Sequence, residues 1–339
     1  MRLHLSNFLA FIMQKSFLLL LTFIYCSVAC NNNKDDELVL HKPPYDKLTD
    51  SIQQTPGEAD LYYRRGSLLF QNEQMAYAER DMLQAWSLAP NETYALSLAN
   101  ILAQKNTDSA ITFLQSSLQK LPQSISLQIS LARSYEQKKQ YQKALEICEN
   151  IISKYANQLD ALILKSEILQ LQKKEMEALA ILEQAYQYAP FDRELVYDLA
   201  FLYAETKNPG VLSITDSLLK TDTLEKHAEP YYFKGVYFQN IGNSVEAIKQ
   251  FNEAIRQDYY FLDAYMEKGQ ILYQQKKYEE ARKIFQLAST VSPTFADAYY
   301  WLGKADEAQG DKTEAKLNYQ RAYGLDKSLT EAKAAADKL

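Results

Sequence analysis

A short motif recurs at a regular interval along this chain, and it restricts the possible folds more than any other feature of the sequence. Gly235, Gly269 and Gly303 are evenly spaced. Each glycine is followed, at constant offsets, by an alanine, an aromatic residue and a second alanine: Ala247, Phe251 and Ala254; Ala281, Phe285 and Ala288; Ala315, Tyr319 and Ala322. A unit this short cannot cover its own apolar face, so successive units must stack and share a continuous core.

Each unit reads as two helices joined by a polar turn. In the clearest copy, Tyr265, Gly269 and Leu272 follow the i, i+4, i+7 spacing of one helical face. A second apolar stripe at helical spacing, from 281 to 288, comes after the polar residues 274–277. A small residue in the first helix allows the second helix to pack closely, and the aromatic residue fills the space beside it.

Further copies extend upstream with small changes in length. Their markers are Gly66, Ala78, Met82 and Ala85; Ala132, Tyr135 and Ala144; and Ala178, Leu182 and Ala185. The copy from Tyr94 to Pro122 has a shortened turn, and the copy around Leu199, Ala200 and Tyr203 lacks the second-helix signature near Pro209 and Gly210. We expect eight units across residues 57–327, the fifth being uncertain, with a helix at 45–56 before them and a capping helix at 328–339.

This pattern resembles the tetratricopeptide repeat over most of the chain. The resemblance implies an all-α fold, a right-handed α-solenoid of antiparallel helix pairs. It also implies a function, because such repeats present a concave groove to a peptide or helix of another protein. No cofactor, metal or catalytic residue belongs to this pattern.

Residues 1–29 have the organisation of a secretory signal peptide. Lys15 precedes nine apolar residues, 17–25, and the small residues Ser27, Val28 and Ala29 follow. This apolar run is too short for an ordinary membrane-spanning helix, which needs about 20 residues. The start codon is either Met1 or Met13.

Cys30 directly follows the small residues, and Ser-Val-Ala-Cys resembles the lipobox of bacterial lipoproteins. The resemblance implies lipid attachment at Cys30, and acyl chains hold a protein on a bilayer because each buried methylene contributes about 0.8 kcal/mol. Residues 30–44 then form a tether. Lys34, Asp35, Asp36 and Glu37 resemble the export signal of surface lipoproteins in Bacteroidetes, so we expect an outer-membrane lipoprotein, on the periplasmic or the surface face.

Charge and cysteine content agree with this location. Without residues 1–29 the chain keeps 35 basic and 43 acidic residues, a formal charge of −8, which disfavours nucleic acid and polybasic membrane contacts. Beyond Cys30 only Cys148 remains, so the core must stabilise the fold without a disulfide. We expect Cys148 to be a small buried hydrophobic residue.

The sequence offers no catalytic motif. It contains no glycine-rich phosphate loop, HExxH, CxxC or GxSxG, and only His41 and His227 remain after the signal peptide. We therefore expect a protein that is not an enzyme and binds no cofactor or metal.

The predicted groove is lined by residues near the start of each first helix. These are Tyr63, Tyr197, Tyr232 and Tyr300, with Met266, Ile163 and Ile129 in other copies; one turn later come Ser67, Arg133, Gln270 and Lys304. Exposed aromatic residues are frequent binding hot spots, so we expect an apolar partner segment. We expect this segment to have some basic character as well, because acidic residues precede the lining position by three residues along the same helices: Asp60, Asp160, Glu194, Glu229, Asp263 and Asp297. The alternative is that some tyrosines only wedge adjacent repeats together.

The predicted function is a membrane-anchored scaffold that binds a peptide or helix of an envelope protein. The alternative is a glycan-binding surface lipoprotein, a family that also uses helical repeats but carries long insertions between them. Here the repeats run nearly back to back. An envelope enzyme ranks third.

Overall fold

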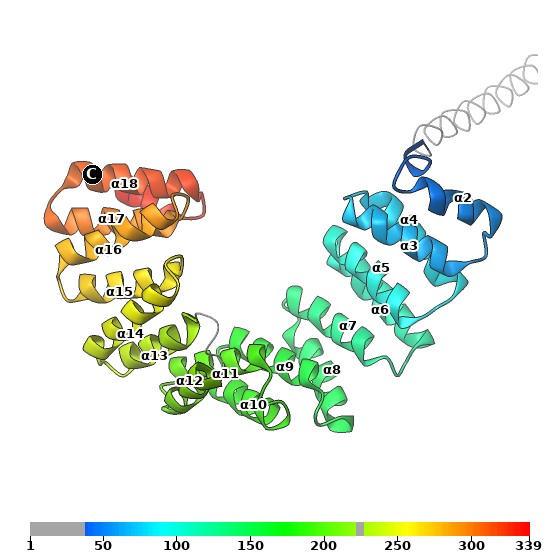
Figure 1. Ribbon diagram of the computed structural model, residues 1–339, viewed down its shortest axis with the longest axis horizontal. Coiled ribbons are helices and arrows are strands. Elements are labelled where there is room, and N and C mark those ends of the chain that lie inside the picture. Colours follow the sequence, from blue (N-terminus) through cyan, green and yellow to red (C-terminus); the bar gives the residue numbers. More distant parts are fainter. Residues whose placement is uncertain (1–37, 222–226) are drawn as a thin grey trace, which may run out of the picture. The chain divides into compact units, whose positions relative to one another are not determined.

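A computed structural model describes residues 38–221 and 227–339, and across these residues the chain is helical throughout, without a β-strand (Figure 1). A first helix, α2 (Asp46–Gln54), precedes eight helix pairs. The pairs are α3 (Ala59–Gln71) with α4 (Met75–Leu88), α5 (Glu92–Lys105) with α6 (Thr107–Lys120), α7 (Ile125–Gln137) with α8 (Tyr141–Lys154), α9 (Leu159–Leu171) with α10 (Glu175–Tyr188), α11 (Arg193–Glu205) with α12 (Gly210–Thr221), α13 (Glu229–Asn240) with α14 (Ser244–Gln257), α15 (Leu262–Gln274) with α16 (Tyr278–Val291), and α17 (Ala296–Gln309) with α18 (Lys312–Leu325). The last helix is α19 (Thr330–Lys338).

The predicted all-α fold of paired helices is confirmed, and the uncertain fifth pair exists, with α12 as its second helix. The described residues form two compact units that meet between residues 151 and 152, and this division falls inside α8. Each unit is described by itself below.

In each of the last three pairs, an aromatic ring of the second helix packs against a glycine of the first helix. A methyl group at Gly269 would lie 2.4 Å from Cε1 of Phe285, and one at Gly235 would lie 2.4 Å from Cε1 of Phe251. Phe251 and Phe285 are completely buried. The glycine therefore leaves the volume into which the aromatic ring of the second helix packs.

Other pairs divide the same volume differently. At the matching positions they carry Ala132 with Cys148, Ser166 with Leu182, Ala99 with Leu114, and Gly66 with Met82. All of these second-helix residues are buried, and Cys148 is the smallest of them. Where the first helix carries alanine or serine in place of glycine, the second helix carries cysteine or leucine in place of the aromatic residue. The combined volume of the two side chains therefore varies less than either side chain alone.

A left-handed residue reverses the chain between the helices of most pairs. This residue is a glycine in two pairs, Gly242 and Gly310, with φ of 83° and 86°. In four other pairs it is a lysine with φ from 57° to 61°: Lys139, Lys173, Lys207 and Lys276. The backbone N–H groups that follow close the first helix, as when Lys277 donates to the carbonyl of Leu272 at 3.0 Å. Between α5 and α6 the single residue Asn106 makes the connection and caps α6 through its side chain.

The first pair has a buried polar network that the repeat pattern does not predict. Arg65 on α3 donates to both carboxylate oxygens of Asp81 on α4, at 2.6 and 2.9 Å, and to the hydroxyl of Thr49 on α2 at 3.0 Å. Thr49 in turn donates to the carbonyl of Leu40 at 2.6 Å. This network attaches α2 and the segment before it to the first repeat.

The last helix covers the other end of the second unit. Ala332 and Ala336 of α19 are buried in the same apolar cluster as Tyr299, Leu302 and Tyr319. Small residues on α19 allow it to lie close to the final pair.

The predicted signal peptide, Cys30 and the acidic motif at 34–37 lie outside the described residues. Among the helices that are described, none is both long and apolar enough to cross a membrane.

Candidate functional site

The tyrosines predicted to line a groove lie between helices rather than fully in solvent. In the first unit, Tyr63 on α3 is half-buried, and its ring lies 5.0 Å from that of Tyr94 on α5. In the second unit, Tyr197 on α11 meets Phe233 on α13 at 5.8 Å. Both contacts join the first helices of successive repeats, so these tyrosines act at least in part as wedges.

Tyr232 shows the wedge arrangement most clearly. Its ring lies 5.8 Å from Phe251 on α14 and 5.3 Å from Phe261, the residue that precedes α15. Burial, followed by the charges of Glu267 and Asp263, raises the pKa of the Tyr232 hydroxyl well above its usual range. The phenol is therefore neutral and packs like an apolar side chain.

Near the C-terminal end, Lys304 lies among aromatic rings. Its Nζ is 4.3 Å from the ring centre of Trp301 and 5.6 Å from those of Tyr300 and Tyr273. This is a cation–π arrangement within the chain itself. Lys304 and Tyr300 thus contact each other and are both half-buried.

The remaining predicted contacts differ in exposure. Met266 is only 6% exposed and belongs to the apolar core, so its side chain is not on a binding surface. Gln270 is half-buried on α15, and Arg133 is exposed on α7 of the first unit. The predicted residues do not converge on one site.

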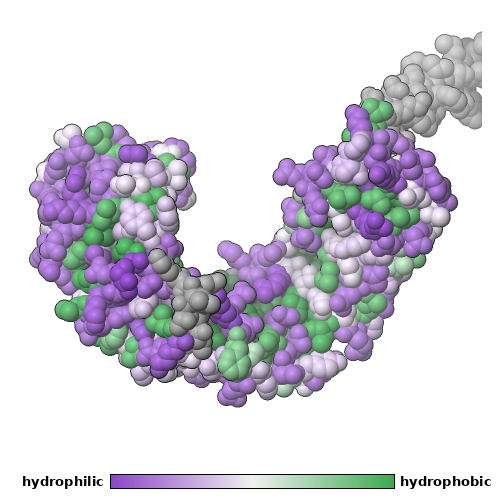
Figure 2. Space-filling view, in the orientation of Figure 1, coloured by the Kyte–Doolittle hydropathy of each residue, from purple (hydrophilic) through white to green (hydrophobic). Residues whose placement is uncertain are grey.

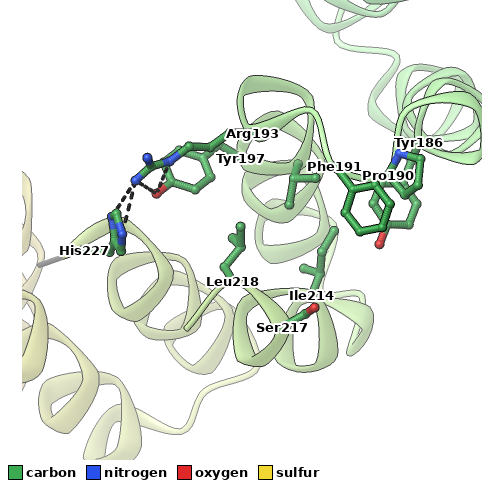
Figure 3. A pocket seen from close by; sticks show the side chains of 10 residues that line it. Tyr186, Pro190, Phe191, Arg193, Tyr197, Ile214, Ser217, Leu218 and His227 are labelled. Atoms are coloured by element: carbon green, nitrogen blue, oxygen red, sulfur yellow. Dashed lines mark hydrogen bonds between the residues drawn. The ribbon is translucent and has the colours of Figure 1, made fainter. Parts of the chain in front are cut away.

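A pocket of about 490 Å³ does occur in the second unit, beside Tyr197 (Figure 3). Its walls come from the end of α10, the loop that leads into α11, the start of α11, one face of α12 and His227, which precedes α13. The apolar part is formed by Pro190, Phe191, Val196, Ile214 and Leu218.

Phe191 stands out on the rim of this pocket. It is 93% exposed, more than any other large apolar side chain in the described residues. Figure 2 shows a surface on which hydrophobic residues are scattered among hydrophilic ones. An aromatic ring next to an apolar pocket is a more specific feature than this scatter.

The residue pattern of α12 explains why the pocket forms here. Other second helices carry small, large and small residues, such as Ala281, Phe285 and Ala288, whereas α12 carries Val211, Thr215 and Leu218 at the same spacing. Ala288 is fully buried, but the larger Leu218 is only half-buried and lines the pocket. This inversion of sizes, together with a helix of 12 residues where α16 has 14, leaves unfilled volume.

The polar end of the pocket is held by Arg193, Tyr197 and His227. Nη2 of Arg193 is 2.6 Å from Nδ1 of His227 and 3.3 Å from the hydroxyl of Tyr197, and the guanidinium lies 5.5 Å from the centre of the Tyr197 ring. Because arginine can only donate, this contact requires an unprotonated Nδ1 on His227. The guanidinium is thus oriented by an imidazole ring on one side and a phenol ring on the other (Figure 3).

Carboxylates gather on α11 beside this region. Partial removal from water, then the charges of Glu167, Glu194 and Asp192, raises the pKa of Asp198 to about 6. Across the described residues there is no cluster of histidine, cysteine and acidic side chains able to hold a metal ion.

Sequence reasoning identified Tyr197 but missed Phe191, Arg193 and His227. The available signals were the lost second-helix pattern near Pro209 and an aromatic residue in the turn after Pro190. Arg193 and His227 are separated by one repeat length, and this spacing indicates neighbouring positions in successive repeats.

Comparison with known families agrees with the helix pairs. Models described as "Tetratricopeptide repeat" match residues 102–168 and 296–329, and a model described as "TPR repeat" matches residues 269–310. The chain is a tetratricopeptide repeat protein. Such proteins are typically non-catalytic scaffolds that bind other proteins.

Two known proteins are similar to parts of this chain. Over 60 residues, the chain is 42% identical to an uncharacterized protein of Methanocaldococcus jannaschii, covering 18% of this chain and 70% of that protein. The crystal structure of a tetratricopeptide repeat protein from Parabacteroides merdae aligns with a TM-score of 0.58 at 18% identity, over 72% of this chain and 96% of that one. The second similarity shows the fold alone.

Proposed function

We propose that this tetratricopeptide repeat protein is a membrane-anchored scaffold that captures a segment of another envelope protein. The observation that carries the binding part of this proposal is the pocket between α10, α11 and α12, with the exposed ring of Phe191 on its rim. Concave apolar sites with a few fixed polar groups are the usual form of a binding site, and aromatic anchors frequently dominate binding energy.

This placement revises the expected binding surface. The predicted tyrosine ladder contributes Tyr197 to the pocket, whereas Tyr232 and Tyr300 make their main contacts within the solenoid. The glycan-binding alternative depends on long inserted loops. Connections such as the single residue Asn106 between α5 and α6 give it no support.

The binding proposal is tested by photo-crosslinking in cells. A benzophenone amino acid replaces Phe191 in one variant and Tyr260 in another, since Tyr260 is also an exposed aromatic, at 73%, but lies outside the pocket. We expect a discrete crosslinked partner, identified by mass spectrometry, from position 191 only. Identical products from both positions, or no product from either, would contradict a binding role for this pocket.

The anchoring part of the proposal rests on the sequence around Cys30. Cys30→Ser is expected to move the protein from the membrane fraction to the soluble fraction, because the described helices include none that could span a bilayer. Cys148→Ser is the matched control, since this buried cysteine lies in the solenoid. Retention of Cys30→Ser in membranes, with the signal peptide removed, would rule out lipid attachment at Cys30 as the anchor.

The membrane face is also open to test. We propose an outer-membrane lipoprotein whose residues Lys34, Asp35, Asp36 and Glu37 direct it to the surface. Replacing these four residues with alanine is expected to protect the protein from protease added to whole cells. Unchanged digestion would show that these four residues do not direct the protein to the surface and act only as a spacer.

A further inference from the structure

We propose that the residues from Leu40 to Tyr45 form a strap that ends the membrane tether early and limits the distance between the bilayer and the first repeat. The strap is held in place by the buried polar network of the first pair. This inference rests on the proposed lipid attachment at Cys30, and it adds how far from the membrane the anchored fold can reach.

The strap belongs to the folded part of the chain although it precedes the repeats. Leu40 and Tyr45 are only 4% and 6% exposed. The hydroxyl of Thr49 on α2 lies 2.6 Å from the carbonyl oxygen of Leu40 and 3.0 Å from that of Tyr45. Within the strap, the backbone N–H of Tyr45 donates to the carbonyl of Lys42 at 2.9 Å. The chain is therefore held from Leu40 onward, by its side chains and by its backbone.

The network gives the Thr49 hydroxyl a fixed direction. The side chains of Arg65 and Asp81 are 6% and 2% exposed, and two N–H groups of Arg65 donate to the carboxylate of Asp81. A third N–H group of Arg65 donates to the oxygen of Thr49 at 3.0 Å. A hydroxyl carries a single proton, so this oxygen accepts from the arginine while its proton is directed at the carbonyl of Leu40. The buried ion pair thereby fixes one backbone position of the strap.

The two ends of the row of repeats are closed by different interactions. At the C-terminal end, small residues of α19 such as Ala332 are buried in an apolar cluster. At the N-terminal end, the first pair carries Arg65 and Asp81 where the last pair carries Leu302 and Asn318. Apolar burial is non-directional and is sufficient to cover the end of a repeat array. A hydrogen-bonded lock on a single carbonyl does more than cover the end, because it determines where the preceding chain leaves the fold.

A hollow beside the lock shows that close packing alone does not hold the strap. The hollow has a volume of about 500 Å³, and its lining includes Leu40, His41, Thr49, Arg65 and Asp81. Because open volume borders these side chains, the strap depends on its hydrogen bonds and on the burial of Leu40. Loss of the Thr49 hydroxyl is therefore expected to release the strap while α3 and α4 stay packed.

The strap shortens the reach of the tether. Leu40 is ten residues from Cys30, and Asp46, the first residue of α2, is sixteen residues from it. Fully extended, these lengths of chain span at most about 35 Å and about 55 Å. A closed strap therefore takes about 20 Å from the maximal distance between the acylated cysteine and the start of the fold. The first repeat is kept within the shorter distance of the bilayer.

Hydrogen exchange of the mature chain, residues 30–339, tests whether Thr49 holds the strap. Thr49→Val removes the hydroxyl with little change of shape. The amides of Tyr45 and Asp46 donate to the carbonyl of Lys42 at 2.9 and 3.2 Å, and we expect both to exchange about tenfold faster in the variant. Protection of α3 and α4 is expected to stay unchanged.

Two threonine variants are the controls for this exchange measurement. Thr49→Ser keeps a hydroxyl at the lock and is expected to exchange like wild type. Thr55→Val removes the hydroxyl of an exposed threonine that donates to the carbonyl of Ser51 at 3.0 Å, at the end of α2, and is expected to leave the strap protected.

Energy transfer to a bilayer tests whether the strap sets the reach. The thiol of Cys30 in the mature chain is coupled to a maleimide lipid in phosphatidylcholine vesicles, while Cys148 is buried. A fluorescent amino acid replaces Ser87, which is exposed on α4, and the acceptor dye is attached to lipid headgroups. We expect lower transfer when Leu40→Ser and Thr49→Val are combined, because the first fixed residue then moves toward α2.

Each other outcome contradicts part of the proposal and overturns it. Faster exchange throughout α3 and α4 would show that Thr49 stabilises the repeat itself and holds no separate strap. Faster exchange confined to the strap, with unchanged energy transfer, would show that the strap does not limit the reach. The coupling to lipid is chemical, so these results do not depend on lipid attachment in cells, which the fractionation of Cys30→Ser decides.

Discussion

The α15–α16 pair and the α11–α12 pair have the same topology, but the order of small and large side chains between their helices is inverted. In the first, Gly269 leaves space for the fully buried ring of Phe285, between the small residues Ala281 and Ala288. In the second, Ala200 stands in place of the glycine, and α12 carries Val211, Thr215 and Leu218. One repeat fills its own interior, and the other leaves a pocket of about 490 Å³.

This difference separates stability from binding within one solenoid. In repeat proteins, each unit is stabilised by its own packing and by its immediate neighbours. A filled pair such as α15–α16 therefore supports the array, while an incompletely filled pair can receive a side chain from another protein. The following predictions test this division.

The largest effect is expected from Phe285→Ala. Removing a completely buried ring leaves a cavity and is expected to lower the free energy of unfolding by about 3–5 kcal/mol. Chemical denaturation measures the loss, and hydrogen exchange is expected to locate it in α15–α18. Thr215→Ala in the open pair is expected to cost about 1 kcal/mol. Equal losses for the two variants would remove the distinction between filled and open repeats.

Gly269→Ala is expected to be the next most damaging change. The added methyl group would lie 2.4 Å from Cε1 of Phe285, and such overpacking typically costs about 1–3 kcal/mol. Combining it with Phe285→Leu reproduces the alanine and leucine found at Ala99 and Leu114, so we expect the double variant to be more stable than Gly269→Ala alone.

A matched glycine-to-alanine change in the first repeat is the control for the loss of stability caused by overpacking. At Gly66 the nearest atoms to an added methyl are 3.2 Å away, and they include the flexible end of Met82. Gly66→Ala is therefore expected to be much milder than Gly269→Ala. Additive losses in the Gly269→Ala, Phe285→Leu double variant would show that the two positions do not compensate for each other.

Tyr232→Ala and Tyr197→Ala are expected to differ in kind. Tyr232 contacts Phe251 and Phe261, so its removal is expected to lower stability by about 1–2 kcal/mol without changing peptide binding at the pocket. Tyr197 lines the pocket and supports Arg193, so its removal is expected to weaken binding more than it lowers the melting temperature. Tyr232→Phe keeps the ring and should be close to wild type. Loss of peptide binding in Tyr232→Ala with an unchanged melting temperature would restore Tyr232 to a binding surface.

The smallest effect is expected from Asp198→Asn in the open repeat. Folding raises the pKa of Asp198 from 3.8 to about 6, so the contribution of this side chain to stability is greatest below pH 3.8 and falls as the pH rises from 3.8 to about 6. Asparagine cannot ionise, so the variant should have the stability of wild type below pH 3.8 and be slightly more stable than wild type at pH 7. Solvent screening at this exposed residue keeps the gain below about 1 kcal/mol.

Glu246→Gln on α14 provides a control of opposite sign. Hydrogen bonds from Gln250 and Lys249 lower the pKa of Glu246, so its contribution to stability is present at pH 7 and is lost as pH falls. The glutamine variant is therefore expected to be less stable than wild type at pH 7. Thermal melts across this pH range measure both effects, and a stability gain in both variants at pH 7 would contradict the assignment.

The sequence by itself determined the repeat and its internal packing. Glycine, alanine and aromatic residues at fixed offsets specify which side chains meet within a pair, because these contacts are local and periodic. The same reasoning anticipated that Cys148 is buried, and the eight pairs follow the predicted spacing. It left the fifth pair in doubt, because the residue sizes on α12 are inverted while the helical spacing is kept.

Only the tertiary structure decided which residues form a site. Arg193 and His227 come from the starts of successive repeats, and Arg65 and Asp81 from two helices of one pair, and neither contact follows from an apolar pattern. Likewise Met266, a predicted binding residue, is in the core, and Tyr232 is a wedge. The reason is that periodicity assigns a residue to a face of its own helix, whereas exposure depends on the volume of the neighbours that pack against that face.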